Sequence, residues 1–154
     1  MAYSGRFRPI NEKKYEGDYN KITYRSLWER GLMRWVDENP DVKSWSSEEI
    51  VIPYISPVDN KSHRYYMDFK ITFISGSTIL VEVKPAHETR PPVKKVTKRP
   101  TNKQQMRYLT EAKTFAVNDA KWAAAKKYAD RRGWKFVIFT QDTLQNLGIG
   151  IGKR

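Results

Sequence analysis

The chain has 154 residues, of which 39% are hydrophobic and 13% aromatic, and its formal net charge is +12. This length and apolar content predict a single domain spanning residues 1–154 with a buried core, and they exclude wholesale disorder. The absence of cysteine excludes disulfides and thiolate zinc sites, and two histidines are too few for a histidine-rich metal centre. No run reaches the roughly 20 apolar residues of a membrane span, and we see no apolar secretory signal, so we expect no membrane partner.

The first part of the chain predicts an arm followed by an amphipathic helix. Residues 1–22 are polar and have no clear period, so we expect an irregular arm that wraps around the domain. Residues 23–38 predict a helix that begins at Thr23 as N-cap and ends at Asn39-Pro40. Its apolar stripe at helical spacing consists of Tyr24, Trp28, Leu32, Trp35 and Val36.

One acidic residue, Glu29, lies beside this apolar stripe. It follows Trp28 and precedes Met33 by one turn, so it can point from the helix toward a sheet. The spacing also allows an ordinary surface ion pair with Arg25, four residues earlier. The helix pattern by itself favours the surface pair.

Three strands are predicted after the helix. Residues 45–55 form the first, with Pro53 marking an edge or an end of the strand. Residues 64–74 and 78–84 form the next two, separated by the turn signal Ser75-Gly76-Ser77. We expect a three-residue turn in which Gly76 adopts the left-handed conformation.

Two carboxylates and a lysine lie on these last two strands. With the turn at 75–77, strand alternation places Asp68 opposite Lys84 and Lys70 opposite Glu82, about 5 Å apart at Cβ. A two-residue turn would instead move Asp68 to the other face of the sheet. Two carboxylates and an amine on one face of a hairpin favour a divalent cation and a phosphodiester, and with the net charge they predict a metal-dependent nuclease.

The Glu82-Val83-Lys84 triplet is weak on its own, because Glu-x-Lys occurs three times in the chain. It is the triplet that lies in an apolar strand, where an unpaired charge is costly to bury. The alternative is an ordinary ladder of ion pairs among Asp68, Glu82 and Lys84 on a solvated sheet face.

The remaining elements complete a mixed pattern. Residues 86–103 predict a long, basic, proline-rich loop that acts as a DNA-gripping flap. Helices are expected over 102–116, with Met106 and Leu109 inward, and from Asn118 to about Arg132, where Gly133 ends the helix. A buried strand over 135–140, a last helical turn over 141–147 and a flexible tail over 149–154 follow. The predicted fold class is α/β, a mixed β-sheet flanked by helices.

Positive charge is concentrated between residues 84 and 107, where eight lysines and arginines face a single acid, Glu88. Such a strip is typical of contacts to a phosphate backbone, which are largely independent of sequence and sensitive to salt. A solubilising loop or a tether to an acidic partner is the alternative. Beyond Lys84, the predicted DNA-binding residues are Arg90, Lys94, Lys95, Lys98, Arg99, Lys103 and Arg107.

The element order, with an acid on the first helix, Asp68 on one strand and Glu82-Val83-Lys84 on the next, resembles the PD-(D/E)xK nuclease superfamily. More closely, the chain resembles TnsA-type transposon endonucleases and the related head-completion nucleases of large tailed bacteriophages. The likeness covers nearly the whole sequence and rests on segments such as Tyr66-Met67-Asp68, Val81-Glu82-Val83-Lys84-Pro85 and Pro91-Pro92-Val93-Lys94. Met67 departs from the motif, which has proline before the aspartate.

The resemblance implies a restriction-endonuclease-like core and a set of catalytic roles. Asp68 and Glu82, with the Val83 carbonyl, would ligate Mg²⁺ or Mn²⁺, and Lys84 would orient or activate the attacking water. Glu29 would complete the acidic cluster, directly or through a water. Glu48, near the start of the preceding strand, is an accessory acid by its position.

Three functions follow as hypotheses. The first is a Mg²⁺-dependent endonuclease acting on double-stranded phage DNA at the end of head packaging, in the host cytoplasm and then in the virion. The second is a structural head-completion protein with a nuclease fold, in contact with portal or neck proteins. The third is a non-catalytic nucleic-acid-binding module. A single site cuts one strand, so a double-strand break would need a homodimer, two visits or a partner.

Overall fold

A computed structural model of the chain describes residues 3–94 and 98–152. At its centre, a four-stranded mixed sheet has the order β3 (Val42–Ser46), β6 (Phe69–Phe73), β7 (Thr78–Val83) and β8 (Lys135–Phe139). The first three strands are antiparallel neighbours, and β8 runs parallel to β7. This mixed sheet confirms the predicted α/β class.

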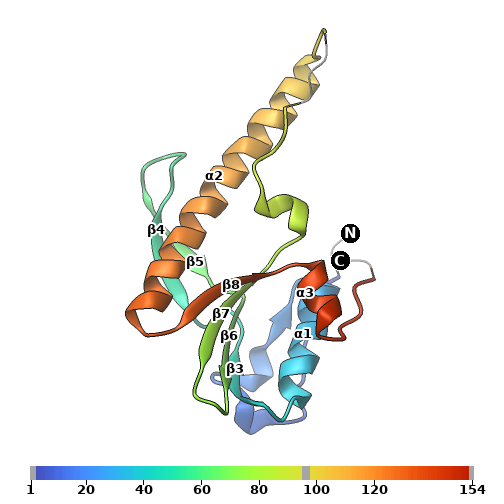
Figure 1. The fold of residues 1–154 in the computed structure, drawn as a ribbon, viewed down its shortest axis with the longest axis vertical. Helices are drawn as coiled ribbons and strands as arrows, with labels where there is room; N and C mark the ends of the chain where they lie inside the picture. Colours follow the sequence, from blue (N-terminus) through green and yellow to red (C-terminus); the bar gives the residue numbers. More distant parts are fainter. Residues whose placement is uncertain (1–2, 95–97, 153–154) are drawn as a thin grey trace.

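Helices cover both faces of this sheet (Figure 1). On one face, α1 (Leu27–Glu38) and the short α3 (Gln141–Asn146) enclose a core that includes Trp45 and Phe69. On the other face, the second half of α2 (Asn102–Arg131) packs over Leu80 of β7. Because β7 is covered on both sides, its last residues are buried, and a charged side chain there needs a partner. None of the helices in the described part of the chain is long and apolar enough to cross a membrane.

The N-terminal arm wraps the domain but contains short elements of its own. These are β1 (Gly5–Arg6), η1 (Glu12–Lys14), η2 (Tyr19–Lys21) and β2 (Thr23–Tyr24), with β1 and β2 antiparallel. Phe7 and Tyr15 pack edge-on against the buried Trp45 ring. The buried Asp37 carboxylate of α1 accepts the N–H groups of Ile10 and Asn11 at 2.7 and 3.0 Å, which fixes the path of the arm.

Helix α1 begins later than the sequence pattern predicts. Its N-cap is Ser26 instead of Thr23, because Thr23 belongs to the short strand β2. The Ser26 hydroxyl accepts the Glu29 N–H at 3.2 Å and donates to the Glu29 carboxylate at 3.2 Å. This cap fixes the direction of Glu29 at the first turn of the helix.

The strands expected at 45–55 and 64–74 are each divided in two. β4 (Val51–Ile55) and β5 (Ser62–Tyr66) leave the main sheet and pair with each other in a separate two-stranded sheet. The two breaks coincide, because the Glu48 N–H donates to the Met67 carbonyl at 3.0 Å and the Met67 N–H to the Ile50 carbonyl at 2.9 Å. The prediction of continuous strands was therefore wrong, and the side-chain alternation resets at Asp68.

The hairpin between β6 and β7 differs from the predicted register by two residues. Its three-residue turn covers 74–76 and is closed by the Phe73 N–H, which donates to the Ser77 carbonyl at 2.8 Å. Gly76 has φ +95°, the positive value expected of it. Lys70 lies opposite Leu80 instead of Glu82, and Asp68 comes alongside Glu82 instead of Lys84. A shift of two residues preserves the face on which a side chain lies.

Residues 102–131 form one continuous helix, where two helices were predicted. Asn118, the expected cap of the second helix, is buried inside α2. In this helix, which is described throughout, the buried residues are Asn118, Trp122, Ala125 and Ala129, all in its second half. The half from 102 to 117 projects away from the body of the protein (Figure 1). Met106 and Leu109, expected inward, are 61% and 51% exposed there.

Two smaller expectations concern the loop and the tail. The stretch after β7 begins with η3 (Ala86–Thr89) and reaches the Thr101 cap of α2 without further regular structure in its described part. Gly133 has φ +74° just beyond α2, which confirms it as the stop. The tail is not loose at Ile149, which is buried in the α1 core. Residues 153–154 lie outside the described part.

Candidate active site

Asp68 and Glu82 meet at the end of β7. Asp68 stands at the corner between β5 and β6, and its Oδ2 accepts the Val83 backbone N–H at 2.8 Å. This bond fixes the Asp68 carboxylate beside the residue that follows Glu82. The pKa of Asp68 is raised well above its usual value, because the group is enclosed by protein and faces the charges of Glu82 and Glu29.

The Glu82 side chain is buried, with 6% of the residue exposed, and both of its oxygens have a partner. Oε2 accepts the Tyr65 hydroxyl at 2.6 Å, and Oε1 lies 3.5 Å from the Lys84 ammonium. These contacts offset the cost of burying the carboxylate. They also place Glu82 beside Asp68, close enough for its charge to raise the pKa of the Asp68 carboxyl.

Tyr65 is a member of the site that strand alternation missed. An unbroken strand from 64 to 74 would place Tyr65 on the face opposite Asp68. The break at Met67 separates β5 from β6, and Tyr65 turns its hydroxyl toward Glu82. Burial and the charges of Glu82 and Asp68 raise the pKa of Tyr65, so the hydroxyl remains a proton donor to Glu82.

Lys84 lies just past the last residue of β7 and is largely enclosed. Its backbone N–H donates to the Phe139 carbonyl at 3.0 Å, continuing the parallel ladder with β8. Its side chain is only 18% exposed and points to Glu82. Pro85 follows directly, so the chain leaves the sheet at this point.

Glu29 joins this group from α1. Its pKa is raised mainly by burial and further by the neighbouring Glu48 charge, and its own charge raises the pKa of Asp68. Glu29 therefore belongs to the same electrostatic cluster as Asp68. The Arg25–Glu29 surface pair allowed by the helix spacing does not form through the arginine side chain, which instead holds Glu48 at 2.8 and 3.3 Å.

Glu48 occupies the corner between β3 and β4 with a φ of +57°. Few residues other than glycine adopt this conformation, and such strain is concentrated at functional sites. Its backbone bond to Met67 places it one residue from Asp68 across the corner. Glu48, predicted as an accessory acid, therefore lies near the acidic cluster.

The donor set suits a hard divalent cation. Mg²⁺ is commonly held by one or two carboxylates and keeps several waters, and Asp68 and Glu82 are two adjacent carboxylates whose repulsion a cation would relieve. Among the residues that the structure describes, no three acidic or histidine side chains are grouped closely enough to form a complete metal cage. The two carboxylates Asp68 and Glu82 therefore fit an ion that keeps part of its water shell.

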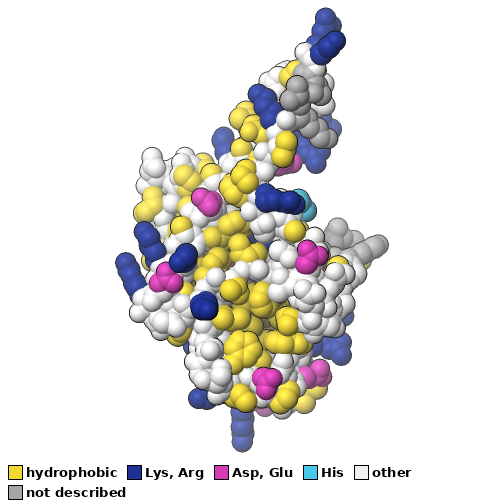
Figure 2. Space-filling view, in the orientation of Figure 1, with side chains coloured by type: hydrophobic (Ala, Val, Ile, Leu, Met, Phe, Trp, Pro, Cys, Tyr) yellow, Lys and Arg dark blue, Asp and Glu magenta, His cyan; other side chains and the backbone are white. Residues whose placement is uncertain are grey.

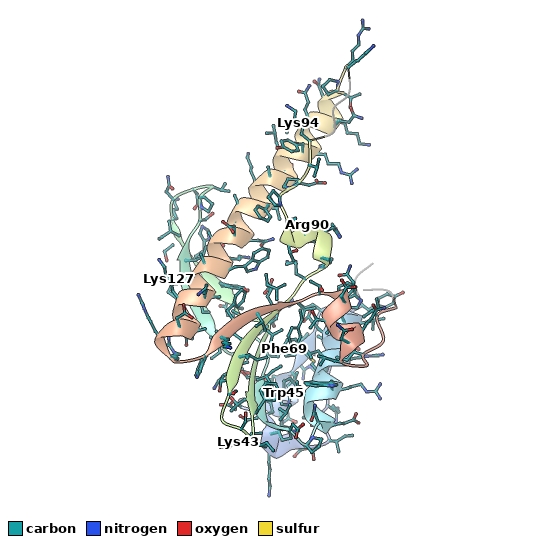
Figure 3. All side chains as sticks on the ribbon, in the orientation of Figure 1. Lys43, Trp45, Phe69, Arg90, Lys94 and Lys127 are labelled. Carbon is teal, nitrogen blue, oxygen red and sulfur yellow. The ribbon has the colours of Figure 1, made fainter. Side chains whose placement is uncertain are left out.

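The predicted DNA-binding residues that the structure describes follow η3 or lie on the outer half of α2. Arg90 stands by η3 and Lys94 beside the outer half of α2 (Figure 3), and both are exposed. Lys and Arg side chains also gather at the tip of the projection (Figure 2). The exposed members beyond Lys94 are Lys98, Arg99, Lys103 and Arg107. Lys95 lies outside the described residues.

Comparisons with known proteins agree with this geometry. Residues 39–141 match the family described as TnsA-like endonuclease N terminal, a range that includes Glu48, Asp68, Glu82 and Lys84 but not Glu29. The chain is 45% identical over 148 residues to the head completion nuclease of Enterobacteria phage T4, covering 96% of this chain and 97% of that protein. No solved structure matches the chain.

Proposed function

The chain belongs to the family of TnsA-like endonuclease N-terminal domains, and we propose that it is a divalent-metal-dependent DNA endonuclease that acts in phage head completion. The family membership agrees with the restriction-endonuclease-like arrangement of its sheet and helices. The observation that carries the proposal is the contact of Asp68 with Val83, which brings Asp68, Glu82 and Lys84 to one buried corner.

Asp68, Glu82 and the Val83 carbonyl would hold Mg²⁺ or Mn²⁺. Such an ion supplies a Lewis acid that neutralises phosphate charge and lowers the pKa of nearby water. The protein's own contribution is to fix the ligands. Val83 N–H holds Asp68, and the Tyr65 hydroxyl holds Glu82, so neither carboxylate needs to reorganise when DNA arrives.

Lys84 would act on the phosphate and the attacking water. Its ammonium lies next to Glu82 in an enclosed corner, where a charge acts more strongly than in bulk water. Negative charge grows on the phosphate oxygens as the bond to the attacking oxygen forms, and a fixed cation stabilises that charge. Glu29 would support the cluster from α1 by keeping negative charge beside Asp68.

The substrate we propose is double-stranded DNA. Residues 102–117 extend about 24 Å at 1.5 Å per residue, which is the length of about seven base pairs. The exposed cations of this half of α2 and of the preceding segment would contact phosphates along that length. These contacts carry little sequence information, so we expect weak sequence preference.

A structural role in head completion is the second candidate, because the T4 relative's name includes head completion as well as nuclease. In that role the protein would contact portal or neck proteins and remain in the virion after assembly in the host cytoplasm. The exposed outer half of α2, with Met106 and Leu109 on its surface, is available for such contacts. Loss of infectivity on removing Lys84 would favour catalysis, whereas full infectivity without Lys84 would favour the structural role.

Nicking of supercoiled plasmid tests the nuclease directly. Wild type is compared with Glu82→Ala and Lys84→Ala in Mg²⁺, Mn²⁺ and EDTA. Lys126→Ala, which removes a cation from an exposed ion pair far along α2, is the matched control. Metal-dependent nicking that is lost in both site variants and kept in the control supports the proposal. Nicking retained in the site variants would contradict the assignment of the site.

A further inference from the structure

Arg25 and Glu48 form a paired contact beside the acidic cluster. The Arg25 Nε donates to Glu48 Oε1 at 2.8 Å, and Nη2 donates to Oε2 at 3.3 Å. Both oxygens of Glu48 are therefore engaged by one guanidinium. An arginine has five N–H donors, so several on Arg25 remain for another acceptor.

Both partners of this pair stand at defined points of the backbone. Arg25 directly precedes the helix cap Ser26, and its backbone N–H lies close enough to the Glu29 carboxylate to lower the pKa of that group. Glu48 has its unusual φ of +57°, and its own N–H is tied to the Met67 carbonyl. The guanidinium thus extends from a residue beside the helix cap and faces a counter-ion whose backbone is tied in place.

The two cations of the site differ in exposure. The Lys84 side chain is 18% exposed and lies against Glu82, whereas the Arg25 side chain is 67% exposed. Arg25 therefore presents positive charge to solvent at the edge of a cluster of carboxylates. A phosphate that approaches these carboxylates meets repulsion, which an outward-facing cation at the edge would offset.

We propose that Arg25 binds a phosphate of the DNA strand that enters the site, and that Glu48 positions Arg25 instead of binding the metal. The inference deepens the proposed nuclease function, since it assigns the part of the site that receives the substrate. A planar guanidinium can hold a carboxylate on one edge and a phosphate on another, which a lysine cannot do.

The alternative for Arg25 is a surface ion pair without function. Exposed pairs of this kind contribute little to stability, so they do not by themselves explain a strained backbone at Glu48. The alternative for Glu48 is direct metal binding. In that role a metal ion would have to share both Glu48 oxygens with the guanidinium that is already bonded to them, so the ion and Arg25 would compete for one carboxylate.

Binding of a short mixed-sequence DNA duplex tests Arg25 without any cutting. Fluorescence anisotropy is measured in EDTA across a salt series for wild type, Arg25→Ala and the control Lys126→Ala. We expect Arg25→Ala to bind about tenfold more weakly, and its plot of log affinity against log salt to be shallower by about one. Arg25→Lys should keep the slope because it keeps the charge. An Arg25→Ala protein with the affinity and slope of wild type would overturn the assignment.

Binding of Mn²⁺ in the absence of DNA tests Glu48. Electron paramagnetic resonance titration compares wild type, Glu48→Gln and Asp68→Asn. We expect Glu48→Gln to bind Mn²⁺ as wild type does, and Asp68→Asn to bind it at least tenfold more weakly. Glu48→Gln losing as much Mn²⁺ affinity as Asp68→Asn would make Glu48 a ligand and overturn its positioning role.

The DNA-binding measurement and the plasmid-nicking assay together separate the inference from the proposed function. If Arg25→Ala binds DNA more weakly than wild type but wild type never nicks plasmid, the phosphate contact stands and the nuclease proposal fails. If wild type nicks and Arg25→Ala binds normally, the nuclease stands and the Arg25 assignment fails. Melting curves of every variant establish that it is folded, and Arg25→Gln replaces Arg25→Ala if the latter is not.

Discussion

The corner at the end of β7 and the outer half of α2 are opposite environments. At the corner, Glu82 is buried, each of its oxygens has a protein partner, and like charges crowd together. On the outer half of α2 (residues 102–117, the projecting arm), cations are exposed and the apolar residues Met106 and Leu109 contact solvent. The surrounding fold holds like charges close together at the corner, whereas the charges on the outer half of α2 are exposed to solvent.

This contrast indicates a division of work. Fixed, enclosed charges act strongly on a reacting phosphate, because no water has to reorganise around them. Exposed charges bind a long polyanion, because each contact is weak, additive and independent of sequence. Substitutions at the corner should therefore lower the rate of DNA cleavage and leave the affinity for DNA unchanged. Substitutions on the outer half of α2 should lower the affinity and leave the cleavage rate unchanged.

The largest effect should come from the corner. We expect Glu82→Gln to lower the rate of DNA cleavage at least 10³-fold, while its affinity for duplex DNA in EDTA stays near that of wild type. The reason is that Glu82 acts through fixed charge at the reacting centre and not through contact with the outer duplex. Single-turnover cleavage and anisotropy binding measure the two quantities. If Glu82→Gln loses DNA affinity together with cleavage rate, the two regions do not divide chemistry and binding between them.

A matched pair of substitutions compares the stability contributions of the two regions. Leu32 of α1 is fully buried, and Leu109 of α2 is 51% exposed. Leu32→Ala should lower the free energy of unfolding by about 2–5 kcal/mol, and Leu109→Ala by no more than about 0.5 kcal/mol. Urea titration followed by circular dichroism gives both values. A large loss in Leu109→Ala would mean that the arm is part of the folding core.

Removing charge from the arm should weaken DNA binding and spare the chemistry. Lys103 and Arg107 are both exposed on the outer half of α2. The double variant Lys103→Ala with Arg107→Ala should bind duplex DNA about tenfold more weakly, with a salt slope reduced by about two. Its cleavage rate at saturating DNA should equal that of wild type. A fall in the saturated rate would show that the arm also orients the substrate.

The smallest effect should be a gain in stability. The pKa of Asp68 is raised in the folded protein, so the folded state binds its proton more tightly than the unfolded state does. Stability from this group is therefore greatest below the ordinary aspartate pKa and is lost as the pH rises through the raised value. Asp68→Asn should stabilise the metal-free protein by about 1 kcal/mol at neutral pH.

Thermal melting across pH tests this prediction. The difference between Asp68→Asn and wild type should shrink as the pH falls toward the ordinary aspartate pKa, where the wild-type carboxyl is also neutral. Adding Mn²⁺ should raise the melting temperature of wild type more than that of the variant, because the ion relieves the repulsion. If Asp68→Asn is less stable than wild type at neutral pH without metal, the Asp68 charge does not destabilise the folded protein and the prediction is wrong.

Several features could be predicted from the sequence. They depend on the conformation of one residue, or only on whether a register error is an even number of residues. The turn at Gly76 and the stop at Gly133 require a positive φ, which glycine adopts readily. Asp68 and Glu82 came to the same side because an error of two residues in register preserves the face of a strand. The roles assigned to Glu29, Asp68, Glu82 and Lys84 stay predictions until the variants are measured.

Other features depended on contacts between distant segments. Asn118 resembled a helix cap, but packing on β4 and the sheet keeps α2 continuous through it. Met106 and Leu109 had core spacing, yet they lie beyond the reach of the sheet that would have covered them. A hydrophobic pattern says which face could be buried, and only the position of the neighbouring elements decides whether it is.

By itself the sequence determined the basic charge, the α/β class and the placement of two acids and a lysine at the ends of two adjacent strands. Tertiary structure alone decided that the chain turns at Glu48 and Met67, which brings Tyr65 to Glu82 and Arg25 to Glu48. The physical reason is that strand alternation has a period of two only while the strand continues. A corner resets it, and a corner is set by hydrogen bonds between segments that are distant in the sequence.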